Sequence, residues 1–196
     1  MEASLATLLS LARLTLHNPR EGAARVLALA LPIPARWAAL ALMAVLSTLL
    51  IHLTFAMQPA DIRGFFGEAL TSPLRKAMLQ AVFMLVSVVA IYQIGRWRGG
   101  HGRFEDALIL VVWLQFLLLG LQTAQLLASL VLPLLADLIG LATLALFFWW
   151  LTNFVAELHG FKSLVLVFVG VLVTLVFMVL VLAFVLAIFL APQAGV

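Results

Sequence analysis

The chain contains no cysteine, which excludes disulfide bonds and metal sites built from thiolates. It also has few charged residues, since Asp, Glu, Lys and Arg make up only 10% of the chain. A soluble domain has about 25%. Hydrophobic residues account for 66% of the sequence, more than a soluble core of this size could hide. The sequence therefore predicts a protein that lies in a lipid bilayer, and its net charge of +3 does not indicate nucleic acid binding.

Long apolar segments follow one another along the chain. A hydrocarbon core about 30 Å thick is crossed by about 20 helical residues. The segments that meet this length lie at about 37–57, 74–95, 106–131, 136–156 and 163–190. The third and fourth come from one apolar stretch that is too long for a single crossing, and we divide it near Pro133 and Asp137. The predicted fold is an all-α, polytopic integral membrane protein, with five transmembrane helices in residues 36–191.

The basic residues are unevenly distributed between the two predicted sides of the membrane. Eight precede the first span or lie in the second-to-third and fourth-to-fifth connections, and three lie on the opposite side. Because basic residues favour the cytoplasmic side, we expect a cytoplasmic N-terminus and an external C-terminus. The N-terminus lacks the basic start and cleavage site of a signal peptide, so we expect it to be retained.

Residues 1–35 are predicted to form a cytoplasmic segment on the membrane surface. In residues 3–16 one set of side chains has helical spacing, and polar side chains occupy another face. The apolar set is Leu5, Leu8, Leu9, Ala12 and Leu16, and the polar set is Ser10, Arg13 and His17. A second short helix should begin after Asn18, with Pro19 in its first turn and Glu21 completing a capping box. Basic amphipathic helices of this kind lie among lipid headgroups and attract anionic lipids.

The stretch RWRGGHGRFEDAL, residues 96–108, raises the question of a phosphate-binding loop. It has neither the Gly-x-Gly-x-x-Gly nor the Walker spacing, and no lysine follows. We interpret it as a cytoplasmic turn in which the glycines permit a tight reversal and the arginines hold the loop at the membrane surface. Glu105 and Asp106 fall in the first turn of the third span, where carboxylates offset the positive end of a helix.

A second hydrophilic segment, residues 152–163, is expected on the same side. Its Glu157 and His159 could meet Glu105, Asp106 and His101, and such a cluster could bind a divalent metal or relay protons. The spacing of Glu157 and His159 matches no recognised metal motif, so we favour a salt-bridged connection between helix ends and predict no metal and no cofactor. The predicted cytoplasmic interaction face consists of Arg13, Arg20, Arg96, Arg98, Arg103, Glu105, Asp106, Glu157, His159 and Lys162.

The polar residues inside the second and third predicted spans are uncharged and share helix faces. Amide side chains in lipid seek partners on other helices, and small residues permit close approach. The predicted helix–helix interface consists of Gln80, Ser87, Gln115, Gly120, Gln122, Ala124 and Gln125. The alternative is a small transporter or channel that uses the Gln and Ser faces. It is less favoured because ion-coupled carriers usually keep a charge inside the membrane.

Three stretches of the chain resemble the bacterial branch of the Yip1-domain family. They are NPREGAARVLAL, GGHGRFEDALILVVWLQ and LTNFVAELHGFKSLVLVFVG, and the resemblance covers about residues 10–180. In that family a Gly-Gly turn opens the third span and a His-Gly pair precedes the last helix. Eukaryotic members lie in endoplasmic reticulum and Golgi membranes and interact with Rab GTPases. Their longer acidic and aromatic N-terminal region, with its Asp-Leu-Tyr-Gly-type motif, is missing here, which argues against Rab binding.

The function expected from these features is that of a non-enzymatic membrane protein. No nucleophile elbow, paired acid and base carboxylates or cofactor fingerprint occurs in the sequence. The Ala-, Leu- and Arg-rich composition fits a bacterial inner membrane. We therefore expect a membrane-organising or accessory subunit that contacts lipids, other membrane proteins or a second copy of itself through lateral helix association and its basic cytoplasmic face.

Overall fold

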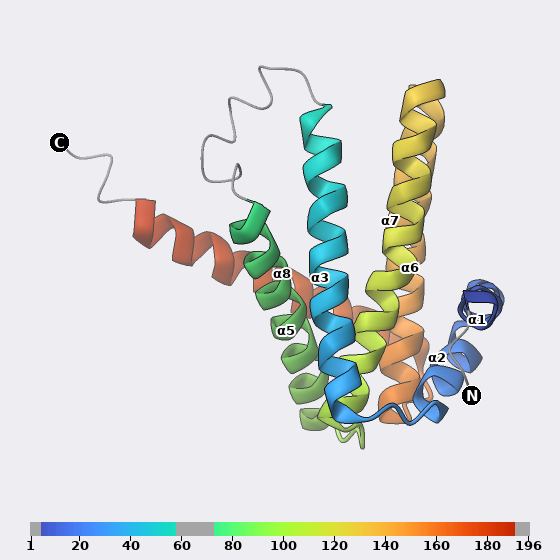
Figure 1. Cartoon of the computed structure of the whole chain (residues 1–196). Helices are drawn as coiled ribbons and strands as arrows, with labels where there is room; N and C mark the ends of the chain where they lie inside the picture. Colours follow the sequence, from blue (N-terminus) through green and yellow to red (C-terminus); the bar gives the residue numbers. More distant parts are fainter. Residues whose placement is uncertain (1–4, 58–72, 191–196) are drawn as a thin grey trace.

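The computed structural model describes residues 5–57 and 73–190 (Figure 1). Within these residues the chain forms seven helices, so the all-α prediction is confirmed. They are α1 (Leu5–His17), α2 (Pro19–Ala28), α3 (Ile33–Ala56), α5 (Pro73–Trp97), α6 (Phe104–Val131), α7 (Pro133–His159) and α8 (Leu164–Leu190).

Four of these helices, α3, α5, α6 and α7, are long and apolar enough to cross a membrane. They form a bundle, and α1 and α2 lie beside one end of it (Figure 1). Helix α8 is also apolar, but the part assessed as a membrane span, Leu164–Leu180, is shorter than the four candidate spans. It packs chiefly on α7, and Figure 1 shows it crossing behind α5 and α3 instead of running alongside them. The described residues thus contain four candidate spans, and the fifth stays a prediction.

The predicted division of the long apolar stretch is confirmed at Pro133. Helix α6 ends at Val131, and Leu132 is extended with φ −148° and ψ 99°. Proline disfavours a helical conformation in the residue before it, and it is itself well suited to the first turn of the next helix. The chain therefore reverses within one residue, and α6 and α7 make the most extensive helix pair of the fold.

The core of the protein lies at the end of the bundle where α6 begins. Residues 107–114 of α6 are all buried, because α2, α3, α5 and α7 pack around this part of the helix. At the other end, α6 and α7 expose large apolar side chains. These include Leu127, Leu130, Leu134, Leu138 and Leu141. A helix that is buried on all sides belongs to a core, whereas an exposed apolar surface of this kind suits contact with lipid.

Helix α1 packs against the bundle with a face that contains a polar residue. Thr15 is fully buried, and its hydroxyl accepts a hydrogen bond from the indole N–H of Trp113 at 3.2 Å. Gly22 lets α2 approach this position closely, since a Cβ there would lie 2.8 Å from the Thr15 Cα. Leu9 and Leu16, two members of the apolar face predicted from spacing, are exposed. The apolar surface of α1 is therefore divided between the bundle and the outside.

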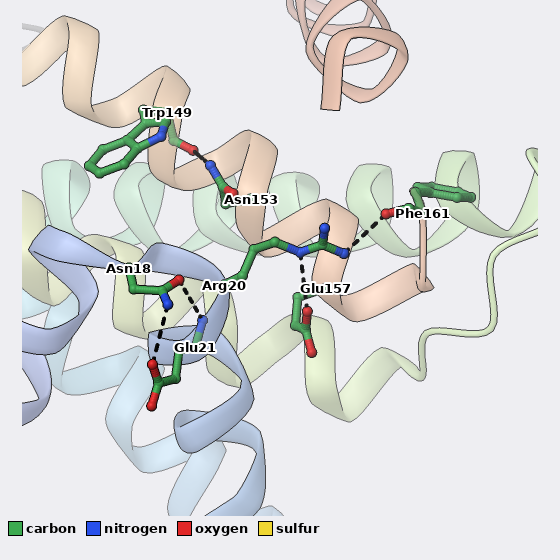
Figure 2. A network of polar contacts seen from close by, with 7 residues as sticks. All are labelled: Asn18, Arg20, Glu21, Trp149, Asn153, Glu157 and Phe161. Carbon is green, nitrogen blue, oxygen red and sulfur yellow. Dashed lines mark hydrogen bonds and ion pairs between the residues drawn. The ribbon is translucent and has the colours of Figure 1, made fainter. Parts of the chain in front are cut away.

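The predicted start of α2 is confirmed. The side-chain oxygen of Asn18 accepts the backbone N–H of Glu21 at 3.3 Å, and its amide nitrogen donates to the Glu21 carboxylate at 3.2 Å (Figure 2). Pro19 occupies the first turn, where its missing N–H costs nothing. This cap fixes the direction in which α2 leaves α1.

Candidate interaction face at the basic end

Polar side chains gather at one end of the bundle, which we call the basic end. It consists of residues 18–36, 96–106 and 157–163, which come from α2, the α2–α3 connection, the α5–α6 connection and the α7–α8 connection. Its side chains fall into two groups. One group binds helix ends to one another, and the other remains exposed.

The most buried charge at this end is Arg36, which is 9% exposed. Its Nε donates to the carbonyl oxygen of Leu31 at 2.8 Å. Its Nη1 donates to the carbonyl oxygen of Glu105 at 2.6 Å and to the Asp106 carboxylate at 2.9 Å. A buried guanidinium is stable only when paired and hydrogen-bonded, and here it joins the start of α3 to the start of α6. The sequence analysis used Arg36 for topology alone, although an arginine at the entrance of an apolar span is a signal of such a role.

Arg20 joins α2 to the end of α7. Its Nε lies 3.3 Å from a carboxylate oxygen of Glu157, and its Nη2 donates to the carbonyl oxygen of Phe161 at 3.1 Å (Figure 2). Both charged side chains are about one third exposed, at 38% and 32%. This contact links residues 137 positions apart, and it holds the N-terminal helices against the bundle.

His159, the last residue of α7, is 2% exposed and is held by backbone groups of α5 and the α5–α6 connection. Its Nδ1 accepts the backbone N–H of Gly102 at 3.2 Å, and its Nε2 lies 3.1 Å from the carbonyl oxygen of Ile91. A backbone amide can only donate and a carbonyl can only accept. The neutral imidazole with its proton on Nε2 therefore satisfies both partners.

Three glycines make room for this imidazole. A Cβ atom at Gly95 or Gly100 would collide with the ring of His159. A Cβ at Gly102 would lie 2.8 Å from the ring Cε1. We call Gly95, Gly100 and Gly102 the glycine cage. The sequence analysis assigned Gly100 and Gly102 to the reversal of the chain, and in the structure they also provide space for a distant side chain.

The reversals at this end depend on two other glycines. Gly99 has φ +83° and Gly160 has φ +72°, a backbone region that favours glycine. The N–H of Gly100 bonds to the carbonyl of Gly95, and the N–H of Phe161 bonds to the carbonyl of Ala156. These are the long hydrogen bonds of a Schellman motif, which satisfies the free carbonyls at a helix end. Both α5 and α7 therefore end in the same way.

The carboxylates and the histidine proposed as a metal cluster are separated by these contacts. Asp106 binds Arg36, Glu157 binds Arg20, and His159 faces the glycine cage. In residues 5–57 and 73–190 no group of three or more His, Cys, Asp or Glu side chains is placed to hold a metal ion. The arrangement that the residues do support is a set of polar contacts between helix ends.

Comparison with protein families gives the chain an identity at the family level. The model of the Yip1 domain matches residues 13–185, which is most of the 196-residue chain. The chain belongs to the Yip1-domain family. The matched region includes both Schellman motifs, the glycine cage and the contacts of Arg20 and Arg36. Comparisons with curated proteins and with solved structures found no match.

The second group of side chains at the basic end of this Yip1-domain protein consists of exposed cations. Arg96 lies over the ring of Tyr92, and Arg103 lies 3.6 Å from Glu105 with 73% of its side chain exposed. The remaining predicted members, Arg13, Arg98 and Lys162, are exposed on α1 and on the two connections. The predicted interaction face is thus divided, since Arg20, Asp106, Glu157 and His159 serve internal contacts.

Two of the glutamines predicted to lie between helices make such contacts. The amide of Gln115 in α6 donates to the hydroxyl of Ser47 in α3 at 2.8 Å. Gln125 lies against Gly140 of α7, where a Cβ would come within 2.7 Å of its amide nitrogen. The sequence analysis had not identified Ser47 and Gly140, because each lies on another helix and neither belongs to a motif.

The other predicted interface residues of the Yip1 domain are placed differently. Gly120 and Ala124 are exposed, and a Cβ at Gly120 would meet only open space. Ser87 donates its hydroxyl to the carbonyl of Phe83 in its own helix. Gln80 and Gln122 are partly buried. Gly120 and Ala124 are therefore available to a neighbouring molecule and not to the bundle itself.

Proposed function

We propose that this protein is a non-enzymatic accessory or membrane-organising subunit of a bacterial inner membrane. Membership of the Yip1-domain family and the four candidate spans make it a multi-pass membrane protein. The proposed role places the basic end in the cytoplasm, together with the N-terminus. It also takes α8 as a fifth span, which would place the C-terminus in the periplasm, and the length and uncharged sequence of α8 support this.

The proposal rests on one observation: the carboxylates at the basic end are paired with cations inside the protein, whereas several exposed cations have no ion pair. Each of its carboxylates has an intramolecular cation: Glu21 has Arg25, Glu105 has Arg103, Asp106 has Arg36, and Glu157 has Arg20. These pairs lie at 3.5, 3.6, 2.9 and 3.3 Å.

Four further cations of the predicted face are exposed and form no ion pair within the described residues. Arg96 is one of them and lies over the ring of Tyr92. The other three, Arg13, Arg98 and Lys162, are called the unpaired cations. The outward surface is therefore positive, although the chain as a whole is nearly balanced. A surface of this kind attracts anionic headgroups and acidic segments of other proteins.

Lateral association is the second part of the proposed role. Gly120 and Ala124 expose a small-residue surface on α6, four residues apart, which would let another helix approach closely. The partner is another membrane protein or a second copy of this chain. We do not expect it to be a Rab-type GTPase or a nucleic acid.

The test is a pull-down from native membranes in a mild detergent. A variant with Arg13→Gln, Arg98→Gln and Lys162→Gln removes the unpaired cations and leaves the internal ion pairs intact. We expect the wild-type protein to retain a reproducible set of partners that the variant loses. Arg63 is one of the three basic residues predicted on the opposite side of the membrane, and it lies outside the described residues. Arg63→Gln is the control and should retain the set.

Two results would contradict the proposal. One is that the protein copurifies with nothing, or that the triple variant keeps every partner. The other is a solute flux in reconstituted vesicles that Gln115→Leu and Gln122→Leu abolish, because that result favours the transporter alternative.

A further inference from the structure

A cleft of about 680 Å³ lies between α5 and α8, with parts of α6 and α7 at its floor. It exists because α8 packs on α7 and makes few direct contacts with α5. Its lining runs from Phe83 to Trp97 along α5, about 21 Å at a rise of 1.5 Å per residue. Half of a hydrocarbon core is about 15 Å thick, so the cleft is long enough to receive a chain that extends through one leaflet.

The inside of the cleft is apolar in effect, because its polar side chains are already bonded to protein. Ser87 and Thr174 donate their hydroxyls to carbonyls of their own helices at 2.9 and 2.7 Å. The amide of Gln115 donates to Ser47 on α3. Each of these side chains therefore already has a hydrogen-bond partner in the protein, and most of the remaining lining is apolar, so a hydrocarbon chain suits the cleft.

The mouth of the cleft has the opposite character. Arg98, just after α5, and Lys162, just before α8, both line this end, and neither forms an ion pair within the described residues. Trp97, the neighbour of Arg98 in the chain, also lines the cleft and is 75% exposed. Tryptophan is typical of the headgroup level of a membrane. Two cations at that level form a site for a phosphate group.

We propose that this cleft binds one anionic phospholipid, with its phosphate at Arg98 and Lys162 and one acyl chain between α5 and α8. Charge complementarity favours this occupant, because the phosphate would meet the two unpaired cations at the mouth while an acyl chain meets the apolar lining. The proposal is independent of the accessory role, because the cleft belongs to one chain and needs no partner protein.

The site is tested by tryptophan quenching in detergent, with phosphatidylglycerol or phosphatidylcholine that carries bromine near the carboxyl end of its acyl chains, which is the depth expected for Trp97. Bromine quenches only the tryptophans that it contacts, so Trp97 reports on the cleft, and Trp97→Phe should remove most of the saturable quenching. Each cation near an anionic headgroup is worth about fivefold in affinity. We therefore expect phosphatidylglycerol to quench at about thirty-fold lower concentration than phosphatidylcholine, a preference that Arg98→Gln with Lys162→Gln removes.

A second variant fills the cleft without touching its charges. Gly170 lines the cleft, and a Cβ there meets only open space, so Gly170→Leu should fold and occupy the path of the acyl chain. We expect it to abolish quenching by both lipids. Ala41→Leu is the matched control, because Ala41 is exposed on α3 and lies outside the cleft. Arg25→Gln is the control for charge, because Arg25 is exposed, pairs with Glu21 and lies outside the cleft.

The proposal is overturned if the double cation variant keeps the preference for phosphatidylglycerol, or if Gly170→Leu behaves like Ala41→Leu. It is also overturned if Gly170→Leu changes the oligomeric mass and leaves quenching intact, because a second copy then fills the cleft. Lipid binding and partner retention are measured separately. Failure of this proposal therefore leaves the proposed accessory function standing, and the reverse also holds.

Discussion

Replacing Arg36 with methionine should lower the free energy of unfolding by about 3 kcal/mol. Methionine keeps much of the length of the side chain and its contacts with the core, so the change removes mainly the charge and the donors. Three acceptors lose their partner: the carbonyls of Leu31 and Glu105 and the carboxylate of Asp106. The carbonyl of Glu105 lies at the start of α6, close in sequence to Ala107 and Leu108, which are fully buried.

The size of this loss in free energy depends on how much hydration the former partners of Arg36 regain. Breaking a buried ion pair by removing one member costs about 3–5 kcal/mol, because the other charge stays buried and unpaired. The side chain of Asp106 is 28% exposed, so it regains part of its hydration and the loss falls at the lower end of that range. For a protein of this size, about 3 kcal/mol corresponds to a decrease of about 6–12 °C in the midpoint of thermal unfolding.

Thermal unfolding in detergent measures this effect, and Arg103→Met is the matched control. Arg103 also pairs with a carboxylate near the start of α6, but its side chain is 73% exposed and the distance is 3.6 Å. Its loss should cost less than about 0.5 kcal/mol. A double-mutant cycle with Asp106→Asn should give a coupling of about 1–2 kcal/mol. Equal midpoints for Arg36→Met and Arg103→Met, or a cycle without coupling, would refute the reasoning.

Further predictions concern the glycine cage, an interhelical hydrogen bond and the last helix. Gly100→Ala should destabilise the fold by about 1–3 kcal/mol in thermal unfolding, and by much less in a His159→Ala background, where the ring is absent; equal losses in both backgrounds would contradict the cage. Gln115→Leu and Ser47→Ala should show a coupling of about 0.6 kcal/mol in a double-mutant cycle, and strictly additive losses would show that the bond contributes nothing. A C-terminal reporter that is active only in the cytoplasm should stay silent if α8 crosses the membrane, and a signal would break the five-span count.

The features that were predictable from the sequence are those whose signal is local. A proline within an apolar stretch marks the α6–α7 reversal, because the restriction acts on the neighbouring residue. The cap at Asn18 involves residues at most three positions apart, and a motif of that length can be read directly. The length of each apolar segment can be read directly from the sequence. The ends of α3, α5, α6 and α7 therefore agree with the predicted spans to within a few residues.

The contacts that organise the basic end were not predictable, because each joins residues far apart in the chain. Arg36 and Asp106 are 70 positions apart, Gly102 and His159 are 57, and Arg20 and Glu157 are 137. The sequence shows which of these residues are polar but not which of them meet. The same limit applies to α1, where the spacing shows an apolar face but not which side of the helix meets the bundle. The position that is buried most completely belongs to Thr15, whose partner Trp113 lies on another helix.

The polar motifs of this chain have a common physical explanation. Helices that end near a membrane surface leave free carbonyls and free N–H groups, and those that are also buried must find partners inside the protein. Gly99 and Gly160 satisfy the ends of α5 and α7 with the same motif, and the histidine beside Gly160 then occupies the space that the glycine cage provides. The residues that most resembled a ligand site are therefore engaged in closing the fold. We propose that the unpaired cations act on other molecules, and two of them, Arg98 and Lys162, line an apolar cleft.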